Sequence, residues 1–433
     1  MTINFFKGHP TRELLPAQEI QDSYRKVLVE TDYLSYDSDV NNQHPLAYGT
    51  DPGNSDVRAT IASWVNKKYH TDTTRADLIN LTAGASYGMA NLLTSVTSPG
   101  ITQRAFVVTP TYFLINNAFV DVGLGDCMTA INETAGEEYE IDLAYLEQQL
   151  LKYSAGLDAV NSETGIIKTD PRGERKYYRF VMYLVPTFSN PGGVTYSLKT
   201  RLKLLELARQ YDLLIMSDDV YEYLDYSNVA AAPIAKINQL DQETVSNKYG
   251  NSISNATFSK IIAPGLRCGW QESPTPHLVH QLGVTGANKS GGTPAQLASL
   301  VVADMIKTGT LDRIIHDFIT KYKERAEVIH QAIKEYLPAG TKVHGGDGGY
   351  FLWIELPPDV DNQKVIDALA AQGVVLAGGQ HFEVYGDERG WGRHCVRVCI
   401  SYLTSSEIRQ GIQLWGETIR KTDKVSKTAV NGH

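Results

Sequence analysis

Short apolar runs alternate with longer helix-period segments through the middle of this 433-residue chain. The apolar runs lie at 78–82, 105–109, 180–185, 213–217, 256–258 and 268–270. Between them, a period near 3.6 residues predicts helices at 56–69, 198–211 and 294–307. Because the apolar runs are continuous rather than alternating, we expect strands that are covered on both faces. This pattern is typical of a mostly parallel sheet in an α/β fold.

A different pattern begins near residue 311. Residues 311–336 form one long, charged amphipathic pattern, which predicts a helix that links two parts of the chain. After it, the sequence predicts strands at 350–356, 374–377 and 396–400, and a closing helix at 405–420. We therefore expect a large domain followed by a smaller α+β domain.

The ends of the chain complete this division. A helix predicted at 17–30 is expected to pack with the smaller domain, and the polar residues 421–433 are expected to fray. The predicted organisation is an N-terminal segment, a large domain and a small domain, at residues 1–35, 36–310 and 311–433.

Composition excludes several classes of protein. Hydrophobic residues make up 42% and charged residues 21% of the chain, which is typical of a globular enzyme. The formal charge is −9 and no block rich in Lys and Arg is present, so the electrostatic pattern of a nucleic-acid-binding protein is missing. The sequence shows neither a signal-peptide pattern nor an apolar run of about 18 residues. We therefore expect a cytoplasmic protein that contacts no membrane.

The cysteines do not form a CxxC pair; they are Cys127, Cys268, Cys395 and Cys399. Cys395 and Cys399 lie near His394, a combination that suits a metal ion. Their apolar neighbours Val396 and Val398 alternate with them as in a buried strand, however. We interpret the pair as reduced core residues and expect no metal site.

Lys260 stands among small hydroxylated residues, ahead of a Pro-Gly turn and Arg267. A lysine amine attacks carbonyls only where part of its population is uncharged, which an apolar surrounding or nearby positive charge favours. The hydroxyls of Thr257 and Ser259 and the guanidinium of Arg267 are suitable donors for a phosphate. Pyridoxal phosphate, an aldehyde that also has a phosphate, would suit both halves of the segment. The alternative is a solvated loop lysine beside an ordinary turn.

A glycine-containing turn precedes another predicted helix. Gly84, Ala85 and Ser86 follow the strand at 78–82 and open that helix. Backbone N–H groups at a helix N-terminus, together with a hydroxyl, suit a phosphate. A plain helix cap by Ser86 is the alternative.

Two acids end the predicted strand at 213–217. Asp218 and Asp219 lie where ligands bind in open α/β sheets, and Tyr221 follows them. A carboxylate there can pair with a pyridine nitrogen, and the tyrosine can hydrogen-bond the ring's phenolic oxygen. The alternative is that the acids cap the next helix.

Asn190 and Arg397 are two further polar residues next to predicted strands. Asn190 follows the strand at 180–185, where its amide can donate to a ring oxygen, although Asn-Pro-Gly is also ordinary turn chemistry. Arg397 lies inside an apolar strand, where an unpaired charge is costly. We expect a carboxylate partner for it, either from a substrate or from a protein acid in a structural salt bridge.

In their order and spacing, these segments resemble the fold-type I pyridoxal-phosphate-dependent aminotransferases of class I/II, most of all the 2-aminoadipate and kynurenine aminotransferase branch. The resemblance covers nearly the whole chain, from residue 3 through the last predicted helix. It also includes Pro45-Leu46-Ala47-Tyr48-Gly49, Gly53, Arg58, Pro110-Thr111-Tyr112 and Gly348-Gly349-Tyr350-Phe351-Leu352-Trp353-Ile354. It implies a three-layer large domain on a mostly parallel seven-stranded sheet, a smaller α+β domain, and a homodimer with shared active sites.

By matching position, the resemblance implies roles for individual residues. Lys260 would form the Schiff base with pyridoxal 5′-phosphate and then move the proton between the substrate's α-carbon and the cofactor. Asp218 rather than Asp219 would hold the pyridine nitrogen, because in the family the acid lies three residues before the tyrosine. The remaining cofactor contacts would be Tyr112 on the ring face, Tyr221 and Asn190 at the ring oxygen, Gly84, Ala85, Ser86, Thr257, Ser259 and Arg267 at the phosphate, and Tyr48 from the neighbouring subunit. The substrate's α-carboxylate would be bound by Arg397, the backbone at Gly8 and the amide of Asn190.

This chain departs from the family pattern in three places. Gly192 replaces the threonine of Asn-Pro-Thr-Gly, and Ala377-Gly378-Gly379 replaces a Pro-Gly turn. In relatives that act on aminoadipate, a helix before the first strand can supply a basic residue for the distal carboxylate, and this sequence starts at that strand. The candidate substitutes are His9, Arg12 and Lys289, each of which is alternatively a surface residue.

The resemblance implies transfer of an amino group from an L-amino acid of the aromatic, kynurenine or aminoadipate type to a 2-oxo acid such as 2-oxoglutarate. One alternative is a carbon–sulfur β-lyase, which uses the same cofactor on the same fold. A second alternative is the effector-sensing arm of a transcription regulator. We disfavour it because such proteins have a basic winged-helix domain ahead of this fold, and the sequence has no room for one.

Overall fold

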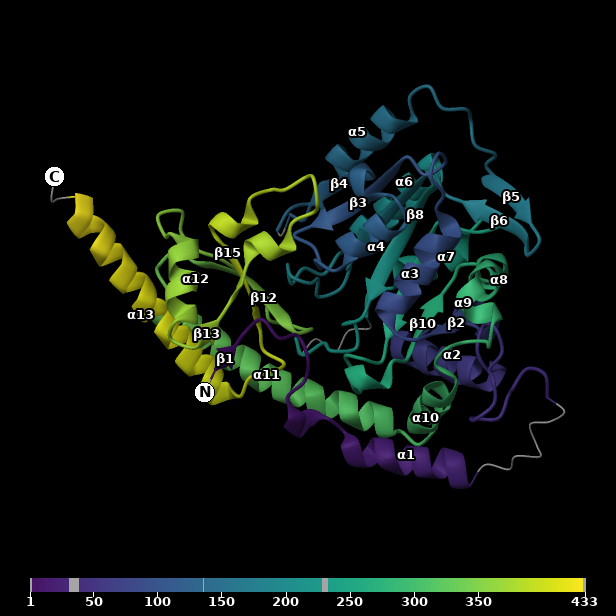
Figure 1. Cartoon of the computed structure of the whole chain (residues 1–433), viewed down its shortest axis with the longest axis horizontal. Coiled ribbons are helices and arrows are strands. Elements are labelled where there is room, and N and C mark those ends of the chain that lie inside the picture. The colour runs from purple at the N-terminus through teal and green to yellow at the C-terminus, as the bar shows by residue number, and fades with distance from the viewer. Residues whose placement is uncertain (1, 31–38, 135, 228–232, 431–433) are drawn as a thin grey trace.

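The computed structural model describes residues 2–30, 39–134, 136–227 and 233–430 (Figure 1). In Figure 1, a large sheet with its helices lies on the right, and a smaller sheet with α12 (Asn362–Ala370) and α13 (Ser405–Val430) lies on the left. The long helix α11 (Thr310–Tyr336) runs along the lower edge between them. Among the described residues, no helix is both long and apolar enough to cross a lipid bilayer.

The large sheet contains seven strands in the described part of the chain, in the order β2-β10-β9-β8-β7-β3-β4. All neighbours are parallel except at β10, which runs antiparallel to β2 and β9. The strands are β2 (Ile79–Thr82), β3 (Arg104–Thr109), β4 (Met128–Asn132), β7 (Phe180–Leu184), β8 (Leu213–Asp219), β9 (Ser252–Thr257) and β10 (Gly269–Glu272). This confirms the predicted mostly parallel, seven-stranded α/β sheet.

Apolar side chains on both faces of this sheet are buried. In β7, Phe180 and Met182 pack in a cluster that includes α5 (Leu143–Ser154) and α6 (Leu198–Tyr211). The intervening residues, such as Val181, pack on the other face in a cluster that includes α3 (Ala85–Val96). Three layers result, and they explain why the predicted strands lack an apolar–polar alternation.

The smaller sheet is antiparallel. Its described strands are β11 (Lys342–Gly345), β12 (Phe351–Glu355), β15 (Cys395–Cys399) and β14 (Ala377–Gly378), in that order. Cys395 and Cys399 are buried free cysteines in β15, and the described residues contain no cluster suited to a metal ion. Their burial agrees with the interpretation of these two cysteines as core residues.

The N-terminal segment touches both parts of the molecule. Strand β1 (Ile3–Asn4) pairs in parallel with β13 (Val374–Val375), next to the small sheet. Helix α1 (Ala17–Val29) instead lies against α10 (Gln296–Lys307), and Lys26 forms an ion pair with Asp304 at 2.5 Å. The proposed division at 35 and 310 stays a prediction.

The predicted helices agree closely with the observed ones. The other main helices are α2 (Ser55–Tyr69), α4 (Ile115–Asp121), α7 (Ile237–Thr244) and α8 (Pro276–Gly283). Helix α6 begins and ends where its period predicts, because Ser197 caps its N-terminus and Asp212 ends it in the left-handed conformation. Helix α13 continues to Val430, past the point where a frayed tail was expected, and residues 431–433 lie outside the described part.

Four strands were not predicted. The antiparallel hairpin of β5 (Ile166–Asp170) and β6 (Gly173–Tyr177) is largely polar, and β4 and β11 are short and mixed. Strand β9 also begins at Ser252, before its apolar run, because Ser252 and Asn255 are buried and hydrogen-bonded to acids of other elements. Local hydrophobicity does not indicate such strands.

We predict that Leu204→Ala lowers the free energy of unfolding by about 2–5 kcal/mol, because the substitution opens a cavity in the cluster beneath α6. Leu202, on the same helix, is 49% exposed, and we expect Leu202→Ala to cost less than about 0.5 kcal/mol. Urea unfolding of both variants measures the difference. Equal effects would contradict the assignment of the buried face of α6.

Candidate functional site

The segments that follow the parallel strands meet at a cavity of about 510 Å³ at the carboxyl edge of the large sheet. Ligands of open α/β sheets bind at this edge. Of the predicted site residues, those that line the cavity are Gly8, Ala85, Ser86, Tyr112, Asn190, Asp218, Tyr221, Thr257, Ser259, Lys260, Arg267 and Arg397. The fold therefore brings together residues that lie up to almost 400 positions apart in the sequence.

Lys260 follows β9 and points into this cavity. Its Nζ donates to the carbonyl of Gly8 at 3.1 Å and lies 5.3 Å from the centre of the Tyr350 ring. Burial lowers the pKa of Lys260 to about 8, and the positive charges of Arg397 and Arg267 act in the same direction. At pH 7, roughly a tenth of the amine is therefore uncharged. The alternative of a solvated loop lysine is wrong.

Asp218 and Asp219 both lie in β8 and face opposite sides of the sheet, so neither caps a helix and that alternative is wrong. Asp218 lines the cavity and accepts hydrogen bonds from Tyr183 Oη at 2.8 Å and Asn255 Nδ2 at 2.9 Å. Burial raises the pKa of Asp218 to about 6, against the effect of these two hydrogen bonds. Asp219 is bound by Ser217 Oγ at 2.7 Å, outside the cavity. At neutral pH, Asp218 is thus a largely ionised carboxylate facing the cavity.

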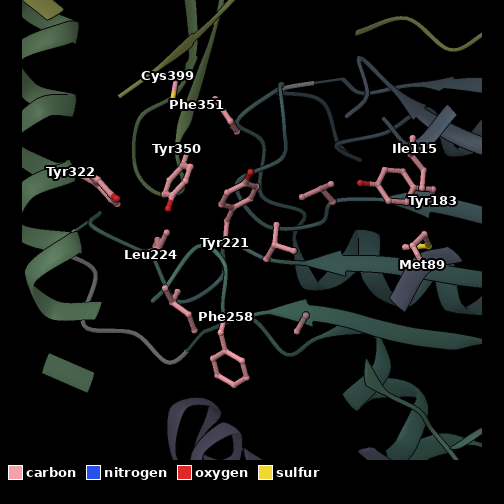
Figure 2. Packing of buried hydrophobic residues seen from close by; sticks show 14 of the residues in the cluster. Met89, Ile115, Tyr183, Tyr221, Leu224, Phe258, Tyr322, Tyr350, Phe351 and Cys399 are labelled. Carbon is pink, nitrogen blue, oxygen red and sulfur yellow. The ribbon is translucent and has the colours of Figure 1, made fainter. Parts of the chain in front are cut away.

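Tyr221 lines the same cavity as Lys260 and Asp218. The centre of its buried ring lies 5.5 Å from that of Tyr350 and 5.9 Å from that of Phe351. Figure 2 shows these three residues in the aromatic cluster. Tyr350 also donates from Oη to the carbonyl of Lys260 at 2.9 Å. The aromatic cluster therefore fixes the backbone that presents the lysine.

An anion cradle forms at the N-terminus of α3. Gly84 is the N-cap, with φ of 93°, and no side chain caps the helix. A Cβ at Gly84 would lie 2.8 Å from Arg267 Nη2, which donates to the carbonyl of Ala83 at 2.9 Å. The hydroxyl of Ser259 lies 3.5 Å from Arg267 Nη1 and 2.9 Å from the hydroxyl of Thr257.

These groups provide a helix N-terminus, hydroxyls and a guanidinium within one corner of the cavity. Such a set of donors fits a phosphate. Ser86 lies in the first turn of α3 rather than at its N-cap, so the alternative of a plain cap by Ser86 is wrong.

Arg397 is a buried cation whose described partners are neutral oxygens. Its Nη1 donates to Asn190 Oδ1 at 2.9 Å and its Nη2 to the carbonyl of Phe6 at 2.7 Å. The guanidinium also lies 4.1 Å from the centre of the Phe351 ring, and burial lowers its pKa to about 10. Within the described residues it forms no salt bridge, which speaks against the alternative of a structural pair with a protein acid. A buried cation that faces a cavity without a counter-ion favours an anionic ligand.

Other predicted residues lie elsewhere. Gly84 adjoins the cavity through Arg267 without lining it, and Tyr48 is 82% exposed and away from it. His9, Arg12 and Lys289 are exposed and do not line the cavity, as their surface alternative predicts.

Sequence reasoning missed several residues of the site. Tyr183 and Asn255 hold Asp218, and Lys7 lines the cavity mouth, where its Nζ donates to Tyr402 Oη at 3.2 Å. Asn255 was the one available signal for these contacts. It lies in a buried strand, and a buried amide requires hydrogen-bond partners. Much of the remaining wall is apolar, with contributions from Phe6, Met89, Phe113, Leu114, Ile115 and Ala118.

Comparisons with known proteins find related sequences and structures over most of the chain. A family model described as "Aminotransferase class I and II" matches residues 36–413. An uncharacterized protein of Saccharomyces cerevisiae, YER152C, is 44% identical over 429 residues, which are 96% of this chain and 96% of that protein. Aromatic-amino-acid aminotransferase 1 of Thermococcus litoralis is 28% identical over 98% of this chain and 89% of its own length. The structure of Pyrococcus horikoshii kynurenine aminotransferase, solved in complex with PMP, superposes with a TM-score of 0.77 and 26% identity, over 97% of this chain and 91% of that one.

We predict that Lys260 of the ligand-free protein reacts with acetic anhydride with a half-maximal rate near pH 8, far below the ordinary lysine value of 10.5. Mass spectrometry of the peptide that contains Lys260 across pH 6–11 measures this rate. Arg397→Leu should move the midpoint upward, because the positive charge of Arg397 lowers the pKa of Lys260. A midpoint above about pH 10 in the unsubstituted protein would contradict the description of this lysine.

Proposed function

The chain belongs to the class I and II aminotransferase family, and we propose that it transfers the amino group of an L-amino acid of the aromatic or kynurenine type to a 2-oxo acid such as 2-oxoglutarate. The observation that supports this proposal most directly is the buried Arg397 beside a largely apolar cavity wall. A cation there suits an α-carboxylate, and the wall suits a large apolar side chain.

The cofactor of this enzyme is pyridoxal 5′-phosphate, which supplies an electron sink for the bonds at a substrate's α-carbon when it is bound. The residues present fit it. We assign the phosphate to the N-terminus of α3 with Thr257, Ser259 and Arg267, whose donors converge in the structure. We assign the pyridine nitrogen to Asp218, because Tyr183 and Asn255 hold its carboxylate in the cavity.

Lys260 is proposed as the residue that bonds the cofactor's aldehyde and moves the proton at the substrate's α-carbon. A pKa of about 8 lets this amine accept a proton and return it near neutral pH. Its half-buried position and the Gly8 carbonyl restrict the directions in which Nζ can point.

Arg397 and Asn190 are proposed to bind the α-carboxylate that donor and acceptor substrates share. Asn190 Oδ1 and the Phe6 carbonyl orient the guanidinium, and the ring of Phe351 supports its plane. An anionic ligand would supply the counter-charge that is missing among the described partners of Arg397.

Lys7 is proposed to recognise the distal carboxylate of a dicarboxylic acceptor. Of the cationic side chains near the N-terminal segment, it lines the cavity, whereas His9 and Arg12 do not. Its exposed ammonium lies 4.6 Å from the ring centre of Tyr402, so the side chain is already directed by a contact.

A homodimer is also proposed. Tyr48 is 82% and Leu46 is 70% exposed, so two large side chains close together in the chain are available for burial by a second copy. Leu114 is 47% exposed and lines the mouth of the cavity. A second copy that covers these residues would place Tyr48 near its partner's site, as the family resemblance implies.

We expect Lys260→Ala to abolish glutamate formation from phenylalanine and 2-oxoglutarate, with a loss of at least about 10³-fold in kcat, because the proton at the α-carbon then has no acceptor. Lys289→Ala, which removes an exposed lysine outside the cavity, should retain full activity. Full turnover by Lys260→Ala would refute the role of this lysine. Steady release of pyruvate and ammonia from a cysteine conjugate, without amino transfer, would instead favour the β-lyase.

A second prediction concerns the acceptor. Lys7→Met should raise the KM for 2-oxoglutarate about five- to tenfold and leave the KM for phenylpyruvate unchanged, because only the former has a distal carboxylate. Arg12→Met, which removes an exposed cation outside the cavity, is the matched control. Equal shifts in KM for both acceptors would exclude a distal-carboxylate role for Lys7.

A further inference from the structure

Glu133 fills the space beside Gly192. It follows the edge strand β4, and its backbone N–H donates to the carbonyl of Thr109 at 2.8 Å. A Cβ at Gly192 would overlap Glu133 Oε2 and would lie 2.9 Å from Ser189 Oγ. The φ of Gly192 is not in the left-handed region, unlike that of Gly193 at 72°. The position of the Glu133 carboxyl, rather than backbone conformation, therefore favours glycine at position 192.

The carboxyl of Glu133 joins the two sides of the loop at 186–196. Its Oε2 accepts from Ser189 Oγ at 3.0 Å, and its Oε1 accepts from Tyr196 Oη at 3.1 Å. Ser189 Oγ in turn accepts from the N–H of Val194 at 3.0 Å. Burial raises the pKa of Glu133 to about 8, so near pH 7 most of this carboxyl is protonated and is buried without a full charge.

Asn190, which holds Arg397, comes directly after Ser189 in this loop. We propose that Glu133 is a positioning residue that fixes the loop so that Asn190 orients Arg397 toward the substrate's α-carboxylate. Gly192 is its complement, because the carboxyl of Glu133 occupies the volume of a side chain at that position. This inference deepens the proposed function and rests on its assignment of Arg397 to the α-carboxylate.

The replacement of threonine by Gly192 then has a physical reason. In this chain, the contacts that a side chain at 192 could make are replaced by a carboxyl from a neighbouring strand end. The two positions form one packing unit, so substitutions at both should not be additive.

The test is a double-mutant cycle on the holoenzyme with Glu133→Ala, Gly192→Ala and the double variant. Each single substitution should raise the KM for phenylalanine and for 2-oxoglutarate about tenfold while kcat changes less than about threefold, because both substrates share the α-carboxylate. The double variant should be no worse than either single one, since removal of the carboxyl makes room for the new methyl group.

Binding of 3-phenylpropionate, measured by calorimetry, gives a readout that does not depend on turnover. Its Kd should rise by the same factor as the KM values, because this ligand has the carboxylate but no amine to transfer. Glu133→Gln should stay within about threefold of the native protein, since the amide matches the shape of the carboxyl and keeps a hydrogen-bond acceptor.

Glu140→Ala is the matched control. Glu140 accepts hydrogen bonds from Ser197 and Thr200 at the start of α6, and not from the Asn190 side of the loop. We expect it to lower thermal stability without changing KM. If Glu133→Ala fails to fold, Ser189→Ala removes the same link without a cavity and should give the same rise in KM.

Unchanged KM and Kd values in Glu133→Ala or Ser189→Ala, or additive effects in the cycle, would overturn the positioning role. A native protein that binds 3-phenylpropionate but transfers no amino group would instead refute the proposed function. In that case the Kd of the variants would still decide the role of Glu133.

Discussion

Burial of one guanidinium without a described carboxylate partner is the constraint on which the site depends. Arg397 lies in the small sheet, and its hydrogen bonds reach Asn190 after β7 of the large sheet and the carbonyl of Phe6 in the N-terminal segment. An incompletely paired buried cation costs free energy, so these three segments are required to meet at one place. The cost that remains favours an anionic ligand.

Burial shifts the pKa values of two other charged groups of the cavity in opposite directions. It lowers the pKa of Lys260 to about 8 and raises that of Asp218 to about 6. Below pH 8 the lysine is charged in both the folded and the unfolded chain, and its burial then lowers the free energy of unfolding by the full amount. Above pH 6 the same holds for the carboxylate of Asp218. Near pH 7 both groups therefore reduce the free energy of unfolding, and a ligand that pairs with them recovers part of this loss.

The N-terminal segment is part of the site rather than an appendage. Strand β1 pairs with β13, and the carbonyls of Phe6 and Gly8 then face Arg397 and Lys260. Neutral carbonyl oxygens orient the two cations without cancelling their charge. The segment thus directs both side chains and leaves their charge available to ligands.

Local patterns in the sequence determined the helices, the central strands and the identity of the residues at the strand ends. Helix α6 was predictable to the residue because its hydrophobic period and its N-cap Ser197 are local features. Charged residues next to an apolar strand indicated a site, because burial of an unpaired charge is costly; they are Lys260, Asp218 and Arg397.

Only the tertiary structure decided the contacts that neither a local pattern nor the family resemblance implied. Nothing near Glu133 in the chain indicates Gly192, and nothing near Lys7 indicates a cavity, because their contacts join elements far apart in sequence. The start of β9 and the partners of Asp218 could not be predicted for the same reason, because Asn255 donates a hydrogen bond to Asp218 on the neighbouring strand. The hydrophobic period is a local property of the sequence. Burial is set by the packing of distant segments, and burial in turn determines the pKa of each group and whether a charge has a counter-ion.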